Sequence, residues 1–147
     1  MKQHPRIIPI LLLSENGFYK TTKYKNPVYI GDPLNTLKIF NEKETDEIII
    51  IDISASKQKK EPNFKLLEEI VSECFMPICY GGGIKSLEHI HKLFQIGIEK
   101  VALNSILLEN PKLVKDTLEI YGSQSIVGVI DINKSLFGNF YLYNYIN

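Results

Sequence analysis

The sequence predicts an α/β fold, namely the N-terminal half of a (β/α)₈ barrel with about five strands and four helices. Short apolar runs alternate with helix-like segments, as in βα units around a parallel sheet. The apolar runs lack regular polar alternation, which is typical of strands covered on both faces. A complete barrel takes about 250 residues, whereas this chain has 147. Residues 1–147 are therefore expected to form a single incomplete barrel domain.

The elements follow one another in a simple order. The expected strands are Arg6–Leu13, Glu47–Ile53, Met76–Tyr80, Lys100–Asn104 and Ser125–Asp131. The expected helices are Pro33–Glu44, Asn63–Cys74, Ser86–Ile96 and Pro111–Tyr121. A doubly wound open sheet is the structural alternative, because βα alternation alone does not distinguish it from a barrel.

Local signals mark the ends of these helices. Asp32 and Asn110 each place a capping side chain before a proline suited to the first helical turn. Gly97 and Gly122 stand where helix C-caps belong. The tail, residues 133–147, is rich in Phe, Tyr and Asn and is expected to form a hairpin after the fifth strand.

Composition and charge indicate an ordinary globular protein. Hydrophobic residues make up 44% of the chain, and 17 basic residues balance 17 acidic ones. This balance creates no net field that would favour nucleic acid or an anionic membrane, so a small-molecule or protein partner is expected. Cys74 and Cys79 lie too close in sequence for a disulfide framework, which favours reduced thiols in the cytoplasm.

The N-terminus superficially resembles a secretion signal, because positive charge precedes the apolar run Ile7–Leu13. Pro5 and Pro9 would break a helix there, and no small-residue cleavage site follows the run. A buried first strand is expected instead. No other stretch approaches the roughly 18 apolar residues of a membrane span.

Three consecutive glycines, Gly81, Gly82 and Gly83, follow a strand and open a helix. Free backbone N–H groups and the helix dipole favour an anion at such a place, so this loop is a candidate phosphate site. The pattern matches neither the dinucleotide nor the Walker motif. A flexible turn is the alternative reading. Asn104 and Ser105 end the next strand and offer neutral donors on the same rim.

Charged residues recur at the starts of three expected strands. Period-two alternation places Arg6, Glu47 and Lys100 on the faces that would line the barrel interior. They would then form a charged ring at the bottom of the barrel. Each could instead be a solvated strand entrance.

Two carboxylates end apolar strands. Asp131 is a candidate general acid or base at the catalytic face of a barrel, or a cap of the following turn. Asp52 is a candidate for active-site or loop support. The histidines at 4, 89 and 91 show no ligand spacing, and no metal site is expected.

These segments together resemble the HisF family, the cyclase subunit of imidazole glycerol phosphate synthase, from about Arg6 to Asp131. The similar segments are Arg-Ile-Ile-Pro at 6–9, Gly-Asp-Pro at 31–33, Asp-Glu at 46–47, Asp-Ile-Ser-Ala-Ser at 52–56, Pro77, Gly-Gly-Gly-Ile at 81–84, Asn-Ser at 104–105, Glu-Asn-Pro at 109–111 and Tyr-Gly-Ser-Gln at 121–124. The resemblance implies a barrel of the ribulose-phosphate-binding type, with substrate phosphate on the glycine loop and Asn104. Asp131 falls on one of the family's two catalytic aspartates.

The resemblance also implies a partner and a nitrogen source. The family takes ammonia from a HisH-like glutaminase docked at the bottom of the barrel, through a gate that resembles Arg6, Glu47 and Lys100. No cofactor is implied. The substrate would be a phosphorylated or nucleotide-linked small molecule.

Leu12 departs from the family, because the other catalytic aspartate should stand there. A positioned acid or base contributes about 10²–10⁴ in rate, so histidine-pathway cyclisation should be severely impaired. This change, with Leu11–Leu13, 24–27 and 73–77, resembles the WbuZ-like branch, which is associated with acetamidino modification of surface polysaccharide sugars. Lys20 resembles a loop lysine of the family.

Three functions follow as hypotheses. The first is an ammonia-using amidotransferase subunit, with C–N chemistry of the lyase or ligase type, that converts a sugar acetamido group to an amidine. The second is the HisF subunit of histidine biosynthesis. The third is a truncated, inactive half-barrel that self-associates. The acceptor sugar, and whether the chain is a gene fragment or a natural short product, are left open by the sequence.

Overall fold

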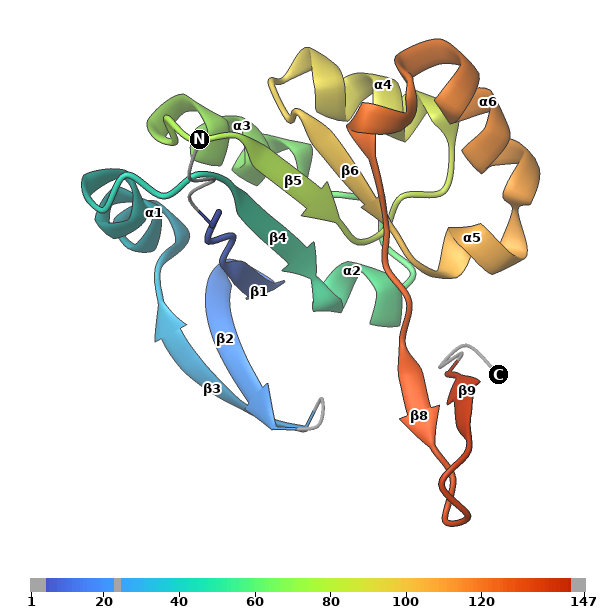
Figure 1. Cartoon of the computed structure of the whole chain (residues 1–147). Coiled ribbons are helices and arrows are strands. Elements are labelled where there is room, and N and C mark those ends of the chain that lie inside the picture. The colour runs from blue at the N-terminus through green and yellow to red at the C-terminus, as the bar shows by residue number, and fades with distance from the viewer. Residues whose placement is uncertain (1–4, 23–24, 144–147) are drawn as a thin grey trace.

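The computed structural model describes residues 5–22 and 25–143, which form a sheet covered by helices on one face (Figure 1). Seven strands lie in the order β3-β2-β1-β4-β5-β6-β7. Their bounds are β1 Ile10–Ser14, β2 Gly17–Thr22, β3 Lys25–Gly31, β4 Ile48–Asp52, β5 Ile78–Gly81, β6 Lys100–Leu103 and β7 Ile126–Gly128. The neighbouring pairs from β1 through β4, β5 and β6 to β7 are parallel.

The order of the parallel strands decides between the two predicted architectures. Each parallel strand pairs with the next parallel strand along the chain, and the order never reverses. A doubly wound sheet reverses its strand order at a switch point, whereas a barrel wall does not. The chain is a partial (β/α)₈ barrel, as predicted.

Four long helices occupy the predicted places, and two short helices were not predicted. The long helices are α1 Pro33–Glu42, α3 Phe64–Glu73, α4 Leu87–Gln95 and α6 Pro111–Tyr121, and the short ones are α2 Ile53–Lys57 and α5 Ser105–Glu109. The side chains of Asp32, Asn63, Ser86 and Asn110 each accept a first-turn backbone N–H and so cap the long helices. Gly122, with φ of 80°, is the C-cap of α6, as predicted.

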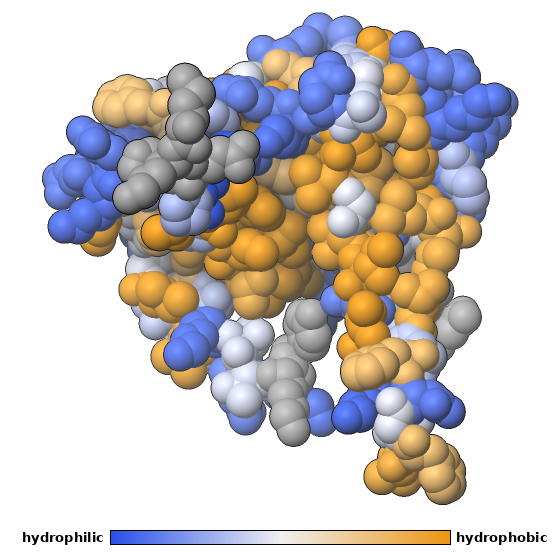
Figure 2. Space-filling model, viewed as in Figure 1, coloured by the Kyte–Doolittle hydropathy of each residue, from blue (hydrophilic) through white to orange (hydrophobic). Residues whose placement is uncertain are grey.

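Side-chain alternation separates a covered face of the sheet from an open one. The covered face packs on the helices through buried residues that include Leu13, Ile48, Ile50, Ile78, Tyr80, Val101 and Leu103. On the open face the register aligns Ile10, Ile49, Cys79 and Lys100 in one row and Leu12, Ile51, Gly81, Ala102 and Val127 in the next. Figure 2 shows apolar side chains gathered on this open face. It corresponds to the interior of a barrel.

An antiparallel hairpin of β2 and β3 extends the sheet beyond β1 and was not predicted. It follows a two-residue turn, with Ser14 paired to Gly17. The turn residues are Glu15, with φ of 55°, and Asn16, so the Asn-Gly pair of the sequence lies one position later than the turn itself. Phe18 of β2 is fully buried in the core, and this side chain anchors the hairpin to the helical layer.

Three of the differences from the predicted strand bounds affect the site. The first strand begins at Ile10 rather than Arg6, although Ile49 N donates to Pro9 O at 2.9 Å; proline has no N–H with which to return a ladder bond. Ile53 starts α2 instead of ending β4. The fifth parallel strand ends at Gly128, so Asp131 lies in the connection that follows it.

The predicted tail hairpin is confirmed for the residues that the structure describes. Strands β8 Ile132–Lys134 and β9 Phe140–Leu142 pair antiparallel and project away from the main sheet (Figure 1). Residues 144–147 lie outside the described part. Phe137 at the hairpin tip is 94% exposed, so this hairpin adds exposed apolar surface.

Candidate functional site

The glycine loop is held tightly by neighbouring backbone. Gly82 and Gly83 adopt φ of 126° and 69°, which side chains rarely tolerate. A Cβ on Gly82 would lie 2.4 Å from Asp52 O, and one on Gly83 would lie 2.6 Å from Lys60 O. A Cβ on Gly81 would lie 2.7 Å from Ala102 O. The loop is therefore closely packed rather than a loose turn.

Helix α4 begins directly after this loop. Ser86 is its N-cap, and the Ser86 hydroxyl accepts from His89 N at 3.2 Å. The partial positive charge of the helix N-terminus therefore lies at the end of the loop. Together with the loop backbone, this arrangement has the chemistry of a phosphate site.

Asn104 and Asp131 come together beside the end of β6. Asn104 Nδ2 donates to Asp131 Oδ2 at 2.8 Å. Asn104 precedes α5 but forms no side-chain cap there, so its amide is directed to the carboxylate instead. Ser105 is the first residue of α5. The structure thus links the residue predicted to bind phosphate with the residue predicted to transfer protons.

Asp52 supports the loops around the site. Its Oδ1 accepts from Ser54 N, Ser54 Oγ and Ala55 N at 2.9, 2.7 and 2.9 Å, which caps α2. Ser54 Oγ also accepts from Glu15 N at 3.1 Å and so joins α2 to the β1–β2 turn. Asp52 is buried, and burial together with the nearby Asp52 carboxylate raises the pKa of Tyr80. Of the two predicted roles, the geometry favours loop support.

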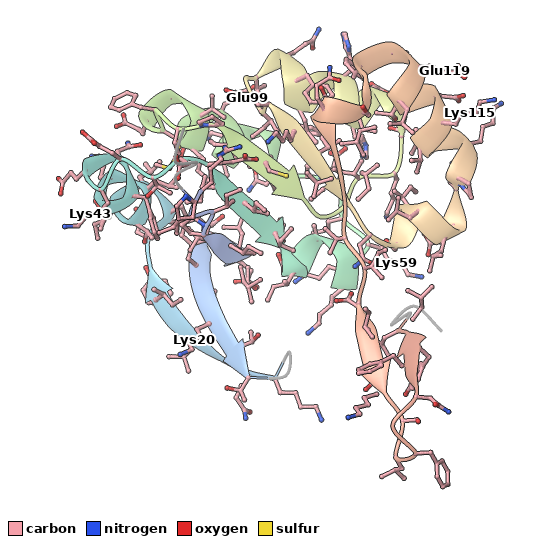
Figure 3. The ribbon with its side chains drawn as sticks, in the orientation of Figure 1. Lys20, Lys43, Lys59, Glu99, Lys115 and Glu119 are labelled. Carbon is pink, nitrogen blue, oxygen red and sulfur yellow. The ribbon has the colours of Figure 1, made fainter. Side chains whose placement is uncertain are left out.

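Leu12 and Lys20 occupy different surroundings. Leu12 is half-buried on the open face and pairs with Ile51 of β4. Lys20 is exposed on β2, in the hairpin beyond β1 (Figure 3). It lies on this outer hairpin rather than at the carboxyl ends of the parallel strands, where Asp52 and Gly81 stand.

Arg6, Glu47 and Lys100 form one ionic cluster at the amino ends of the strands. Lys100 Nζ donates to Glu47 Oε1 and Oε2 at 2.8 and 2.7 Å, and Arg6 Nη2 donates to Oε2 at 3.0 Å. The Glu47 side chain is 3% exposed. Glu47 is therefore not a solvated strand entrance, because it is buried and accepts from both Lys100 and Arg6, whereas the Arg6 side chain remains 56% exposed.

Cys79 adjoins this cluster on the open face and was missed as a site residue. It pairs in register with Lys100 and is fully buried. Burial and, to a lesser extent, the Glu47 charge raise the pKa of Cys79 to about 12, while Lys100 opposes the shift. Period-two alternation along β5 could have placed this thiol beside the ring.

The remaining predicted absences concern metals and membranes. Across residues 5–22 and 25–143, no group of three or more His, Cys, Asp or Glu side chains is arranged to hold a metal ion. His91 instead contacts Tyr121 and Gln95 through hydrogen bonds of 2.8 and 2.9 Å. Within the same residues, no helix has the length and apolar character needed to cross a membrane.

The fold and these residues define a class of protein: the wall of a (β/α)₈ barrel, with a glycine loop at the carboxyl ends of its strands and the ionic cluster of Arg6, Glu47 and Lys100 at their amino ends. The chain belongs to the histidine biosynthesis protein family, whose model matches residues 6–145. The predicted resemblance to HisF is thereby confirmed at the level of the family.

Several relatives carry HisF names. A candidate imidazole glycerol phosphate synthase subunit hisF2 of Pseudomonas aeruginosa is 53% identical over 90% of this chain and 53% of the relative. A candidate HisF subunit of Leptospira borgpetersenii is 50% identical over 93% of the chain and 54% of the relative. The imidazole glycerol phosphate synthase subunit HisF of an Exiguobacterium is 36% identical over 95% and 54%. The chain spans about half the length of the curated relatives it matches.

Proposed function

We propose that this chain forms the first half of the barrel of an ammonia-using, HisF-like synthase subunit of a glutamine amidotransferase. The observation that carries this proposal is the ionic cluster in which Glu47 accepts from Arg6 and Lys100 at the amino ends of the parallel strands. The glycine loop lies at the carboxyl ends of the same sheet. The Glu47 side chain is 3% exposed, so the cluster is held at the inner side of the strand ends, where a gate to the open face would have to lie.

In this proposal each end of the barrel has one task. A glutaminase subunit releases ammonia at the amino edge, and the ring of Arg6, Glu47 and Lys100 controls its entry. The apolar open face carries ammonia without offering it protons. At the carboxyl ends of the strands the glycine loop, Asn104 and Ser105 hold a substrate phosphate, and Asp131, which accepts a hydrogen bond from Asn104, transfers protons. No cofactor takes part in the proposed reaction.

Two acceptors are candidates for this ammonia. The relatives' names favour the imidazole glycerol phosphate chemistry of histidine biosynthesis. Leu12 favours another acceptor, because leucine cannot supply the proton transfer of an aspartate. In that case ammonia would replace the carbonyl oxygen of a sugar acetamido group, which leaves as water, to give an acetamidino group for a surface polysaccharide. We also propose a cytoplasmic location, since the thiols of Cys74 and Cys79 are free.

The ring can be tested through the thiol beside it. In a Cys74→Ser background, Glu47→Gln removes a negative charge that raises the pKa of Cys79. We expect the pKa of Cys79 to fall, so the thiolate fraction, and with it the rate of alkylation by iodoacetamide at a fixed pH, should rise. The alkylation rate is measured as a function of pH. A change in the pKa of Cys79 shifts this profile along the pH axis, whereas a change in solvent access to the thiol alters the rate by the same factor at every pH.

Lys100→Met is the opposing control for that measurement. It removes a positive charge that lowers the pKa of Cys79, so the pKa should rise. Equal shifts in both variants would show that the ring charges do not act on this part of the interior.

The glycine loop can be tested with inorganic phosphate. Gly82→Val places a β-branched side chain at φ of 126° and within 2.4 Å of Asp52 O, so phosphate binding should weaken at least about tenfold. Gly138→Val is the matched control, because Gly138 also has positive φ but nothing lies within 4 Å of its Cβ position. Asn104→Ala leaves the loop backbone unchanged and should also weaken binding. Unchanged phosphate affinity, by NMR titration, in both site variants would refute the site.

A further inference from the structure

The segment from Asp52 to Glu61 wraps around the glycine loop. Asp52 O lies against Gly82, and Ala55 Cβ lies 3.0 Å from the Cβ position of Gly83. Lys60 O and Glu61 C lie 2.6 and 3.2 Å from that same position. The path of the loop therefore depends on where residues 59–61 are held.

Helix α2 ends in a strained turn at this place. Lys60 N donates to Ala55 O at 2.9 Å, which is the closing bond of a Schellman motif. The residue before it, Lys59, has φ of 54°, in the left-handed region where glycine is usual. A side chain at such a residue persists only when surrounding contacts fix it.

Lys85 provides the fixing contact. Its Nζ donates to Lys59 O at 2.9 Å. Because Lys85 is two residues after Gly83, this bond joins the exit of the glycine loop to the strained turn. Figure 3 shows Lys59 at the end of α2, on the side to which the β4 and β5 strands point.

The same turn is positively charged. Lys57, Lys59, Lys60 and Lys85 are all exposed around it, and Glu61 is the one acidic residue between Asp52 and Glu68. The Glu61 carboxylate lies 3.5 Å from His89 Nε2 and does not pair with one of these lysines. These lysines would therefore attract an anion to the neighbourhood of the glycine loop.

We propose that Lys85 is a positioning residue of the phosphate site, which closes residues 52–61 around the glycine loop by binding the Lys59 carbonyl. The inference rests on the phosphate binding proposed above. Lys85 acts through the backbone of the turn, and its contribution exceeds that of its charge alone.

The experiment compares two lysines that carry the same charge. Lys85→Met removes the bond and the charge, whereas Lys57→Met removes only charge, since no side-chain hydrogen bond or ion pair of Lys57 is present among the described residues. Inorganic phosphate affinity of the 147-residue chain is measured by NMR titration at low salt. We expect Lys85→Met to weaken affinity about tenfold, the effect of losing a charge-assisted hydrogen bond, and Lys57→Met to weaken it about twofold.

A second measurement needs no ligand. Amide hydrogen exchange at residues 58–61 should accelerate in Lys85→Met, remain unchanged in Lys57→Met and be restored by Lys85→Arg, which can still donate to the carbonyl. Equal losses of affinity in the two Met variants, or unchanged exchange in Lys85→Met, would overturn the role of Lys85 and leave the phosphate site standing. Absence of phosphate binding by the wild-type chain would overturn both.

Discussion

Replacing Leu12 with aspartate is expected to raise imidazole glycerol phosphate formation by about 10²–10⁴ in a complete barrel whose first half is this chain, because that factor is typical of a positioned acid or base. Leu12 lies half-buried on the open face, in register with Ile51 and Tyr19. A carboxylate there would face the same interior as the apolar rows.

The measurement uses a chimera of residues 1–147 and the second half of the Pseudomonas aeruginosa relative, with ammonium salts as the nitrogen source. Leu12→Asn is the matched control, since it has the size and polarity of aspartate but transfers no proton. If Leu12→Asp gained no more than Leu12→Asn, the departure at this position would not explain any loss of histidine-pathway activity.

The long helices and the ring could be predicted because their signals are local or periodic. Asp32 and Asn110 are read as caps from their own neighbours in sequence, and the structure places both as predicted. Period two placed Arg6, Glu47 and Lys100 on a common face but left solvated strand entrances as an equal alternative, and only the family resemblance favoured the ring. The spacing between neighbouring strands then brings the three side chains within hydrogen-bonding distance.

Other parts of the site depend on tertiary contacts that no spacing encodes. Asp52 ends a strand as a catalytic carboxylate would, yet three donors from α2 use one of its oxygens. The bond between Asn104 and Asp131 joins two connections separated by 27 positions. Lys85 could not be distinguished from other surface lysines until the carbonyl of Lys59 was placed beside it.

The 147-residue chain by itself is expected to self-associate, because its open sheet face is apolar. Ile10 is 62% exposed there, and Ile8 is 37% exposed. β7 forms one edge of the sheet and has no strand beyond it in the described structure. Unpaired edges recruit other strands, and contiguous apolar patches beyond a few hundred Å² are rare on soluble monomers. A second copy could cover the face and the edge together.

Sedimentation at about 100 μM, a concentration at which a weak apolar interface of micromolar affinity is occupied, should show a dimer or larger species. Ile10→Lys should shift the chain toward monomer, because the charge would have to be buried in the interface. Ile39→Lys is the matched control: Ile39 is 57% exposed, almost as much as Ile10, but lies on α1 away from the open face. If both variants dissociated alike, the contact would not involve the sheet. A compact wild-type monomer at this concentration would show instead that the chain tolerates its exposed face, and the self-association proposal would be wrong.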